Sequence, residues 1–339
     1  MNKLATIEKI HSIQPHPNLE VTKIELGKVK EWPVIIPKGQ FHEEDLVVFI
    51  QIDSIVPESN PYFEFMRKQK FRVWNAKFKK APSQGLVCPL SILPPKHFAN
   101  LDIQYQEGDD VTEILGVIKY EKPLDLSMCG DAKGGFPTHL IPITDEDNLL
   151  NNPEVLNEFI GEECYITVKA DGSSMTAICQ NGEIRICSRR LEQKEGTGFW
   201  KIAEILDLPN KLKALGKNIA IQAEAVGGKI QGNPMGLSEP SMFVFNIKDI
   251  DTGKWYNWNE IKELCFILKL TPVLPIMENF TFHMSISELQ DIANHVIYTT
   301  SNEEKRNGEG IVLRTVIPKY SSILGKLLSV KILNQEYNK

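Results

Sequence analysis

The stretch Cys164-Tyr165-Ile166-Thr167-Val168-Lys169-Ala170-Asp171-Gly172 decides the fold of the second half of this chain. Its first six residues alternate in polarity, which predicts a β-strand, and Asp-Gly predicts a tight turn directly after it. Residues 173–179 have the composition of a second strand, Asn181-Gly182 is a strong hairpin signal, and residues 184–187 form the returning strand. The pattern therefore predicts an antiparallel meander with Lys169 at the end of its first strand.

Two helices are predicted beyond this meander. In the first, apolar residues recur at i, i+3, i+4 and i+7, at Ile261, Leu264, Cys265 and Leu268. In the second, Ser285 and Glu288 have the spacing of a capping box ahead of an apolar periodic run. A sheet with peripheral helices indicates an α+β domain.

The first hundred residues have the pattern of short strands separated by turns. Residues 22–26 alternate, residues 32–36 are rich in β-formers, and residues 46–50 form an apolar run after an acidic turn. Residues 85–88 resemble another strand, and residues 108–111 another turn. Many short strands at this spacing predict a small barrel or sandwich.

Residues 65–80 are a candidate nucleic-acid-binding segment. The chain has a net charge of −6, so any binding of nucleic acid has to rest on a local patch. The segment has no acidic residue and four aromatic ones, and its seven basic residues are Arg67, Lys68, Lys70, Arg72, Lys77, Lys79 and Lys80. It would suit an OB-type barrel that binds nucleic acid, and a solvated surface loop is the alternative.

The length of 339 residues exceeds what one hydrophobic core usually serves, so we expect two domains. Glycine and proline concentrate between Met128 and Pro142, which indicates a linker. We place a first domain at residues 1–128, the linker at 129–142 and a second domain at 143–339.

The composition is that of an ordinary globular protein, with 42% hydrophobic and 24% charged residues. No apolar stretch approaches the roughly 20 residues that cross a bilayer, and charges interrupt the N-terminus before a signal peptide could form. The six cysteines are scattered without C-x-x-C spacing, which suits reduced core thiols. We therefore expect no membrane partner and an intracellular location, in cytoplasm or nucleus.

The string Lys169-Ala170-Asp171-Gly172 is the most informative candidate for chemistry. No P-loop, dinucleotide-binding, zinc-protease or G-x-S-x-G motif is present. A lysine at a strand end can reach a bound phosphate as a covalent nucleophile, while an aspartate two residues later reaches a metal or its waters. Because the string is short, an exposed lysine beside a β-turn is the alternative at this point.

Four further motifs give the string a family resemblance. Lys169-x-Asp171-Gly172 resembles motif I of the covalent nucleotidyltransferases, the superfamily of ATP-dependent ligases and mRNA capping enzymes. In the same order follow strings that resemble its ribose-contacting arginine motif, its strand glutamate, and motifs III and IV. These strings are Ser188-Arg189, Gln222-Ala223-Glu224, Phe243-Val244-Phe245-Asn246-Ile247 and Glu309-Gly310-Ile311-Val312-Leu313-Arg314.

The chain departs from the superfamily pattern at two positions. Asn246 stands where motif III usually has aspartate. Motif V has the pattern lysine, one residue, lysine, and residues 328–332 supply only the second lysine, Lys331, with Ser329 at the first position. Lys326 is a possible substitute for the missing lysine.

The N-terminal half resembles one RNA ligase family in particular, the Deinococcus and Naegleria type with an N-terminal OB domain. The strings that carry this resemblance are Gly39-x-Phe41, residues 45–54, residues 82–87, and Phe136-Pro137-Thr138-His139 leading to Thr144-Asp145-Glu146. The resemblance implies an α+β chain in which an N-terminal OB-type β-barrel precedes an antiparallel-sheet, ATP-grasp-like nucleotidyltransferase domain.

The same resemblance implies an ATP-dependent RNA ligase that joins a 3′-hydroxyl RNA end to a 5′-phosphate at nicks in duplex, as in RNA repair. AMP would pass from Lys169 to the 5′-phosphate, and we expect a monomer to suffice. The implied catalytic residues are Lys169 as nucleophile, with Lys331 and Lys326. The implied nucleotide-binding residues are Val168, Arg189, Glu224, Phe243, Phe245, Glu309, Lys326 and Lys331, with Phe245 preferred to Phe243 for stacking on adenine. Magnesium or manganese would be held by Asp171, Glu224 and Glu309, directly or through water.

Two other functions remain to be weighed. An mRNA capping guanylyltransferase shares the lysine chemistry, but its OB domain follows the catalytic domain, whereas here the barrel pattern comes first. A non-catalytic nucleic-acid-binding protein would explain the barrel and the basic segment, but it has no need of Lys169, Asp171, Glu224 and Glu309 together. Lysine adenylylation separates the ligase from the binding protein, and the nucleotide used separates it from the capping enzyme.

Overall fold

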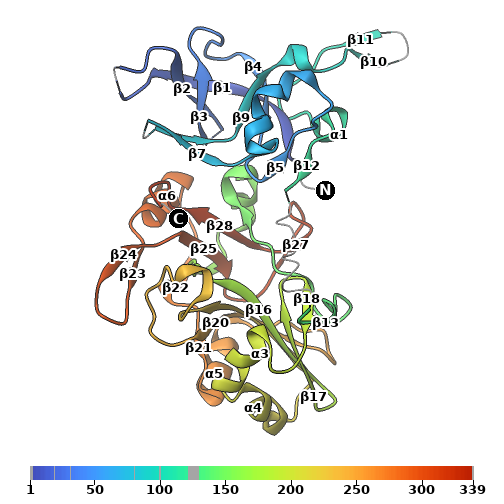
Figure 1. The fold of residues 1–339 in the computed structure, drawn as a ribbon, viewed down its shortest axis with the longest axis vertical. Helices are drawn as coiled ribbons and strands as arrows, with labels where there is room; N and C mark the ends of the chain where they lie inside the picture. The colour runs from blue at the N-terminus through green and yellow to red at the C-terminus, as the bar shows by residue number, and fades with distance from the viewer. Residues whose placement is uncertain are drawn as a thin grey trace. The chain divides into compact units, whose positions relative to one another are not determined.

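The computed structural model describes residues 3–18, 20–30, 32–79, 81–98, 101–120 and 130–337. The chain divides into two compact units, Met1–Pro123 and Leu124–Lys339, which are described separately below (Figure 1). Residues 121–129, where the first domain was expected to end, lie outside the described residues, as do Lys80 and Cys129. The expected domain limits therefore stay a prediction.

The N-terminal unit is built on a curled five-stranded antiparallel sheet, ordered β3-β2-β1-β4-β9 (Figure 1). Its strands are β1 (Ala5–Pro15), β2 (Ile24–Val29), β3 (Trp32–Pro37), β4 (Leu46–Ile50) and β9 (Leu86–Pro89). The register of β1 against β2 shifts between Ile10 and Ser12. Such a bulge bends a strand and increases its twist, which lets the sheet curl around a core. The expected strands at residues 32–36 and 46–50 are confirmed.

Shorter elements complete this unit. They are β5 (Ser54–Ile55), β6 (Arg72–Val73), β7 (Asn75–Phe78), β8 (Ala81–Gln84), β10 (Lys96–Phe98), β11 (Leu101–Ile103), β12 (Ile118–Lys119), α1 (Thr112–Leu115) and the 3-10 helices η1 (Pro61–Gln69) and η2 (Leu90–Ile92). Phe63 and Met66 of η1 pack into the core with Ile7 and Val48 of the sheet. The basic segment thus begins in a helix that the strand pattern did not predict.

The described part of the second unit is built on two large sheets. The seven-stranded sheet, ordered β13-β18-β17-β16-β19-β20-β21, comprises β13 (Ala132–Gly135), β16 (Ser173–Gln180), β17 (Glu183–Ser188), β18 (Leu191–Gln193), β19 (Ile219–Val226), β20 (Ser241–Asp249) and β21 (Thr271–Pro272). The five-stranded sheet, ordered β14-β28-β25-β15-β22, comprises β14 (Asp147–Asn148), β15 (Glu163–Val168), β22 (Pro275–Thr281), β25 (Gly310–Thr315) and β28 (Ser329–Leu333). Pairing is antiparallel except at the edge strands β21 and β14.

Helices and small hairpins surround these sheets (Figure 1). They are α3 (Gly198–Ile205), α4 (Leu208–Leu215), α5 (Trp258–Leu268), α6 (Ile286–Asn294), η3 (Leu149–Asn151), η4 (Pro153–Glu158), η5 (Ile230–Gly232), the hairpin of β23 (Ile297–Thr299) with β24 (Lys305–Asn307), and the hairpin of β26 (Tyr320–Ser321) with β27 (Lys326–Leu327). The capping box predicted at Ser285 and Glu288 is present at the start of α6.

The meander predicted around Lys169 is confirmed. β15 and β16 flank the Asp-Gly turn, and β16 pairs antiparallel with β17 from Met175–Ser188 to Gln180–Glu183. Asn181 and Gly182 have φ values of 52° and 77°, as the two central residues of the favoured hairpin turn require. β13, within the segment expected to be a linker, pairs with β18 and so belongs to the sheet of the second unit.

Side-chain alternation gives the five-stranded sheet two different faces. Ile166, Leu313 and Val330 belong to the core cluster that also contains Leu289 and Ala293 of α6. Because neighbouring side chains on a strand point to opposite faces, the residues between them point away from α6.

Two further observations concern membrane-spanning helices and cysteines. No helix in the described ranges is long and apolar enough to span a membrane. Five of the six cysteines fall within these ranges, and all five are free and buried.

Candidate active site

Lys169 lies where β15 ends and is held from both its backbone and its side chain. Its backbone N–H donates to the carbonyl of Gly310, at 2.8 Å, which extends the pairing of β15 with β25 by one bond. Its ammonium Nζ lies 2.6 Å from Oε2 of Glu309, the residue before β25. The two side chains are 23% and 20% exposed, so the ion pair is accessible from solvent yet largely desolvated.

Two glycines allow the backbones around this ion pair to approach closely. A Cβ on Gly172 would lie 2.1 Å from the carbonyl oxygen of Ala225, in the strand that carries Glu224. Gly310 has a φ of +146°, and a Cβ there would lie 2.2 Å from the carbonyl oxygen of Ile332. Neither contact tolerates a side chain, so glycine is required at both positions.

Three carboxylates act on Lys169. Burial works to lower the pKa of Lys169, but Glu309, Glu224 and Asp171 outweigh it, and the pKa lies above its ordinary value. Burial raises the pKa of Glu224 to about 7, with Glu309 and Asp171 adding to the rise and Lys169 opposing it. Asp171 is only 2% exposed. The site therefore holds more acidic groups than its one lysine neutralises, which favours the arrival of a further cation.

Aromatic rings of β20 face this site across the space between the sheets. Phe243 is opposite Glu224 on the paired strands, and opposed residues share a face. The register of β19 against β20 then shifts by one residue, and Asn246 is opposite Gln222. Phe245, at this shift, lies with its ring centroid 5.5 Å from the Arg314 guanidinium of the other sheet. Both rings thus lie on the site's side.

Lys331 and Ser329 also lie on the face of the five-stranded sheet that points away from α6. Lys331 is paired with Val312, which is paired with Thr167, two residues before Lys169. Ser329 is paired with Arg314, two residues further from Lys169 along the strands. The position that motif V assigns to its second lysine is therefore the one nearer to Lys169.

Three consecutive acidic residues, 145–147, each form an ion pair with a basic side chain. Asp145 Oδ1 lies 3.0 Å from Nη2 of Arg189, and Asp147 Oδ2 lies 2.9 Å from Nζ of Lys326. Lys326 also donates to the backbone carbonyl of Asp145. Glu146 pairs with the third basic residue, described next. We call residues 145–147 the acidic segment.

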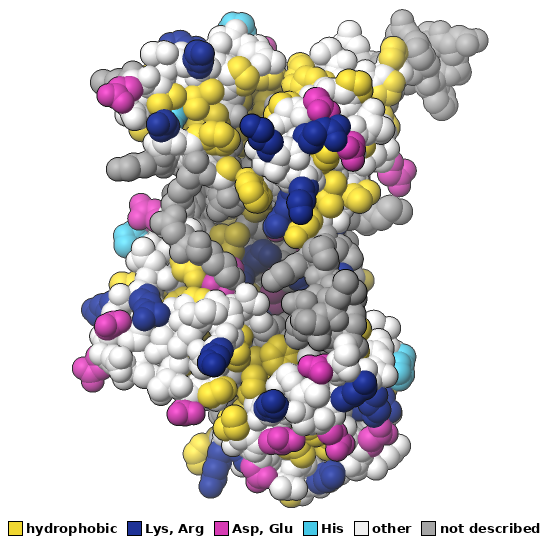
Figure 2. Space-filling model, viewed as in Figure 1, with side chains coloured by type: hydrophobic (Ala, Val, Ile, Leu, Met, Phe, Trp, Pro, Cys, Tyr) yellow, Lys and Arg dark blue, Asp and Glu magenta, His cyan; other side chains and the backbone are white. Residues whose placement is uncertain are grey.

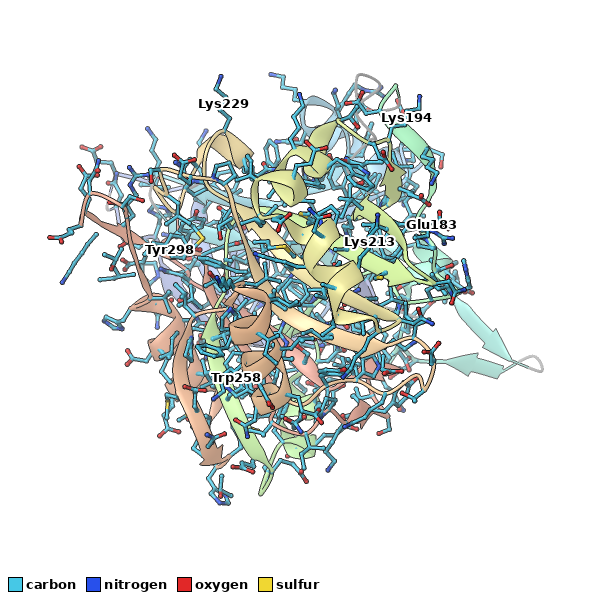
Figure 3. The ribbon with its side chains drawn as sticks, turned by 90° about the horizontal axis from the view of Figure 1, so that it is seen from below. Glu183, Lys194, Lys213, Lys229, Trp258 and Tyr298 are labelled. Carbon is cyan, nitrogen blue, oxygen red and sulfur yellow. The ribbon has the colours of Figure 1, made fainter. Side chains whose placement is uncertain are left out.

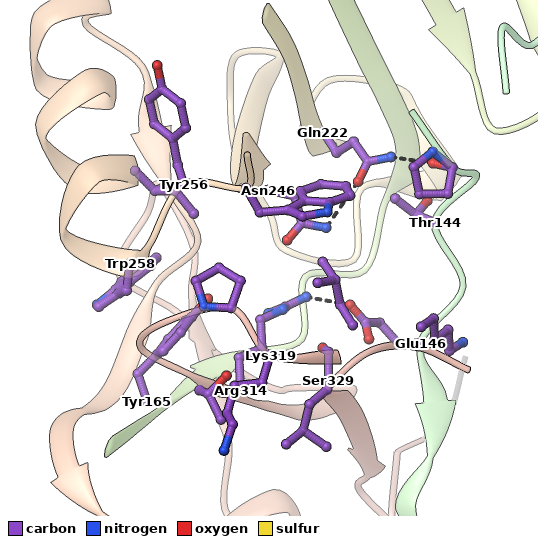
Figure 4. A pocket seen from close by; sticks show the side chains of 18 of the residues that line it. Thr144, Glu146, Tyr165, Gln222, Asn246, Tyr256, Trp258, Arg314, Lys319 and Ser329 are labelled. Carbon is purple, nitrogen blue, oxygen red and sulfur yellow. Dashed lines mark hydrogen bonds and ion pairs between the residues drawn. The ribbon is translucent and has the colours of Figure 1, made fainter. Parts of the chain in front are cut away.

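Arg314 pairs with Glu146 inside a cavity of about 150 Å³ (Figure 4). Its Nη2 lies 2.7 Å from Glu146 Oε1, and Arg314 is 7% exposed. Burial works to raise the pKa of Glu146, but Arg314, Ser329 and Lys326 together outweigh it and hold that pKa below its ordinary value. Nε and Nη1 of Arg314 have no hydrogen-bond partner among the described residues. Arg314 thus keeps two buried N–H groups without a described partner beside this cavity.

The amides of Gln222 and Asn246 line the same cavity (Figure 4). Asn246 donates through Nδ2 to Oε1 of Gln222 at 3.0 Å, and Gln222 donates through Nε2 to the carbonyl of Pro142 at 2.7 Å. These bonds fix the orientation of both amides. The neutral Asn246, in place of the usual aspartate, leaves Glu146 as the described ion-pair partner of Arg314.

Comparisons with known proteins identify relatives of this chain. The RNA ligase family model matches residues 162–328, and an OB-fold domain model matches residues 4–90. RNA ligase structures from Naegleria gruberi are 30% identical to this chain: a lysine variant with AMP and Mn at a TM-score of 0.77, and a form with PPi at 0.76. Each alignment covers 99% of this chain and 98% of the other. A lysine variant with ATP and Mn, also at 30% identity and a TM-score of 0.77, covers 98% of both chains. No curated protein sequence matches the chain.

This chain belongs to the RNA ligase family. Its fold class is the one expected, an N-terminal OB fold followed by the α+β domain that carries the lysine. The order of the two matches, OB fold first, also fits an RNA ligase rather than a capping enzyme.

The ligase's expected site residues come together in the second unit. The charges of Glu309, Glu224 and Asp171 act on Lys169. Phe243 and Lys331 lie on neighbouring strands, with side chains on the site's side. Arg189 and Lys326 are paired instead with Asp145 and Asp147 of the acidic segment. Among the described residues no group of three or more His, Cys, Asp or Glu side chains forms a ready-made metal cage. The individual roles stay predictions.

Sequence reasoning missed two side chains of this ligase that contact the lysine turn directly. The hydroxyl of Tyr298 donates to the carbonyl of Lys169, and the hydroxyl of Tyr337 donates to Asp171. Neither tyrosine belongs to a recognised motif, and no local pattern distinguishes them from other tyrosines. Arg314 and Asp145 were quoted only as letters of larger strings.

The basic segment of the N-terminal unit is only partly free to bind. Arg67 pairs with Glu58 and Glu64, each at 2.6 Å, and Arg72 pairs with Asp53 at 2.7 Å. Lys68, Lys70 and Lys79 are exposed, whereas the side chain of Lys77 and all of Lys80 lie outside the described residues. The aromatic rings of Phe65, Trp74 and Phe78 are 59%, 49% and 46% exposed. On the face drawn in Figure 2, basic and hydrophobic side chains of this unit alternate, with some acidic ones among them.

Proposed function

We propose that this chain is an ATP-dependent RNA ligase that seals nicks in duplex by joining a 3′-hydroxyl RNA end to a 5′-phosphate through lysyl-AMP. The observation that carries the proposal is the contact of Lys169 Nζ with Glu309 at 2.6 Å, at a strand end among buried carboxylates. The related Naegleria gruberi structures contain ATP and Mn, AMP and Mn, or PPi. These are the nucleotide, the transferred group and the leaving group of lysine adenylylation, which supports the proposal.

In the first step, the amine of Lys169 attacks the α-phosphorus of ATP. A nitrogen–phosphorus bond forms, the bond to the bridging oxygen breaks, and pyrophosphate leaves. The amine has to lose a proton first, because its pKa lies above the ordinary value. Glu309 Oε2, at 2.6 Å, is the nearest described acceptor for that proton.

The carboxylates around Lys169 suit Mg²⁺ or Mn²⁺ in their chemistry. Both ions prefer oxygen ligands, and Mg²⁺ commonly binds through one or two carboxylates together with substrate phosphates and water. This mode of binding agrees with a site that is rich in carboxylates but in which the described residues form no preformed cage. Asp171, Glu224 and Glu309 would hold the ion directly or through water. When bound, the ion supplies positive charge that offsets the phosphate and favours the neutral form of Lys169.

The nucleotide would lie along β15, with its α-phosphate at Lys169 and its base toward the cavity of Arg314. Four residues of strand separate Lys169 from Tyr165, the cross-strand partner of Arg314, which is about 13 Å. Phe245, beside Arg314, is then the ring better placed to stack on adenine. Lys331 would neutralise phosphate oxygens from the neighbouring strand.

Arg189 and Lys326 would exchange partners when ATP arrives. Arg189 is paired with Asp145, and Lys326 is paired with Asp147. A phosphate or ribose hydroxyl offers the same kind of acceptor, and charge-assisted bonds to phosphate are strong. The acidic segment thus keeps two cations in place until the nucleotide replaces its carboxylates.

Two further steps complete the reaction. The 5′-phosphate of RNA attacks the phosphorus of lysyl-AMP, which releases Lys169 and forms a 5′–5′ pyrophosphate link to AMP. The 3′-hydroxyl then attacks the 5′-phosphorus, forms the phosphodiester bond and displaces AMP. The N-terminal unit would bind the duplex near the nick, with Lys68, Lys70 and Lys79 on phosphates.

The chain would act alone and inside the cell. Every side chain assigned to the chemistry comes from one chain, so a monomer suffices. Five buried, free cysteines suit a reducing compartment, the cytoplasm or nucleus.

Nucleotide choice and end chemistry test this proposal together. The protein is incubated with Mg²⁺ or Mn²⁺ and either ATP, GTP or NAD, and its intact mass is measured. It is then given a nicked duplex with a 5′-phosphate and either a 3′-hydroxyl RNA or a 3′-hydroxyl DNA strand. We expect labelling by ATP alone and sealing of the RNA nick. Labelling by GTP alone would move the assignment to a capping enzyme, and no labelling of folded, AMP-free protein would refute ligase chemistry.

A further inference from the structure

Tyr298, the middle residue of β23, is labelled in Figure 3. It bridges the backbones that carry Lys169 and Glu309. Its hydroxyl donates to the carbonyl of Lys169 at 2.6 Å and accepts from the backbone N–H of Glu309 at 2.9 Å. Tyr298 is 2% exposed. The bond from the Lys169 N–H to Gly310 comes just before this point in the ladder, so the phenol oxygen stands between the two chains where direct pairing stops.

This insertion has a geometric consequence for the ion pair. A direct ladder bond would bring the two backbones to the ordinary strand spacing of about 4.8 Å. A bridging oxygen with a bond of normal length on each side holds them further apart while still satisfying both polar groups. Tyr298 therefore sets the separation of the peptides from which the side chains of Lys169 and Glu309 meet.

Tyr337 holds the other end of the same turn. Its hydroxyl donates to Oδ2 of Asp171 at 2.6 Å. The segment that carries it is built around Asn334, which is 2% exposed. Asn334 donates through its backbone N–H to the Glu309 carbonyl at 2.9 Å and through Nδ2 to the Gly308 carbonyl at 3.0 Å.

Asn334 then turns the chain back toward the site. Its side-chain Oδ1 accepts from the N–H of Glu336 at 2.8 Å, and its carbonyl accepts from the N–H of Tyr337 at 3.3 Å. The loop before Glu309 and the tyrosine on Asp171 are thus anchored by one buried residue. Such an anchored turn delivers the phenol of Tyr337 to a defined place.

We infer that Tyr298 and Tyr337 are positioning residues that hold the Lys169–Asp171 turn from two sides, one through the lysine's own peptide and one through the aspartate carboxylate. The inference rests on the proposed function, because it assigns both tyrosines to lysine adenylylation. Tyr298 keeps Lys169 at the distance from Glu309 from which the amine attacks. Tyr337 fixes one oxygen of Asp171, so that the other is presented in a constant direction to a metal or its water.

The experiment compares Tyr298→Phe and Tyr337→Phe with a matched control, Tyr320→Phe. Tyr320 lies in β26 of the same unit and is 72% exposed, so its change removes the hydroxyl of an exposed side chain. Single-turnover adenylylation of the full chain is followed over a range of ATP and of Mn²⁺ concentrations, after wild type and Lys169→Ala have been compared. Three further quantities are measured on the same samples. They are hydrogen exchange of the peptide covering Glu309, Mn²⁺ binding from the electron paramagnetic resonance signal of free Mn²⁺, and the melting temperature.

The two variants should fail differently. Tyr298→Phe should lower the maximal adenylylation rate by about tenfold or more, with half-saturating ATP nearly unchanged, because a misplaced nucleophile affects the reaction and not the binding. Hydrogen exchange at Glu309 should become faster, since its N–H has lost its acceptor. Tyr337→Phe should raise the Mn²⁺ concentration needed for half-maximal binding and adenylylation by about tenfold or more, as is typical when a group that orients a metal ligand is removed.

A merely structural role predicts a lower melting temperature for both variants, with ATP and Mn²⁺ dependences equal to those of wild type per folded molecule. That result, or variants indistinguishable from Tyr320→Phe, would overturn the inference. If Tyr298→Phe does not fold, the half-buried Tyr337 still decides the matter through Mn²⁺ binding. Absence of labelling in wild type would instead refute the proposed function. This comparison of wild type with Lys169→Ala is made first, so the two failures can be told apart.

Discussion

Replacing Gly172 with alanine should damage the chemistry far more than the fold. The added Cβ would lie 2.1 Å from the Ala225 carbonyl oxygen, whereas a carbon and a carbonyl oxygen in contact are about 3.3 Å apart. The two groups must therefore separate by about 1 Å. Ala225 is held in the middle of its sheet by β16 and β20, so the turn after Lys169 has to move.

A displacement of about 1 Å at reacting groups costs on the order of 100-fold in rate. We expect that loss in single-turnover lysine adenylylation by Gly172→Ala, measured by intact mass against time at saturating ATP. Gly134→Ala is the control, because a Cβ at Gly134 meets nothing within 4 Å and the residue lies in an edge strand of the same unit. If Gly172→Ala, shown to be folded, reacts within about threefold of the control, the turn does not position the lysine in the way described.

Three other predictions concern charge. Glu146→Gln leaves the buried Arg314 without its carboxylate and should lower the free energy of unfolding by about 3 kcal/mol. The folded-state pKa of Glu146 lies below its usual 4.5, so wild type should lose this stabilisation as the pH falls below about 4.5. The variant lacks the carboxyl group and should not show this loss. Labelling of Lys169 by an amine-reactive reagent should require a higher pH than labelling of exposed lysines, because its pKa lies above the ordinary value. Replacing Lys68 and Lys70 with alanine should weaken the salt dependence of binding to a nicked RNA duplex. The slope of the logarithm of the binding constant against the logarithm of the salt concentration should become shallower by about 0.9 for each lysine that contacts a phosphate.

Controls separate these effects from general damage. Arg67→Ala should change the salt dependence less than a lysine variant, because its guanidinium is already paired with Glu58 and Glu64. Equal acid sensitivity of wild type and Glu146→Gln in chemical denaturation would contradict the assigned ion pair. Reaction of Lys169 at the same pH as exposed lysines would show that the three carboxylates do not act on it.

Local patterns predicted the strands and turns around Lys169 well. Alternating polarity, Asp-Gly and Asn-Gly act within a few residues, and the structure places β15, β16 and β17 where they indicate. The capping box of α6 is equally local. Residues 65–69 escaped this reasoning because η1 is a 3-10 helix that buries Phe63, before the basic segment, and Met66, within it.

Contacts across long stretches of sequence could be predicted only through the family resemblance. Lys169 and Glu309 are 140 residues apart, and nothing in either string alone points to the other. Tyr298 and Tyr337 were beyond reach, because they act through a backbone carbonyl and a single carboxylate oxygen. Such bonds depend on where two loops end in space, and tyrosine is common enough that composition carries no signal.

The central claim is that Lys169 forms a covalent bond with AMP. The most direct measurement is peptide mapping of the protein after reaction with ATP and Mn²⁺, beside Lys169→Ala that has been shown to fold. The account predicts one AMP adduct, on Lys169, that disappears when pyrophosphate or a 5′-phosphorylated nicked duplex is added. An adduct on another residue, or none on folded wild type freed of bound AMP, would contradict it.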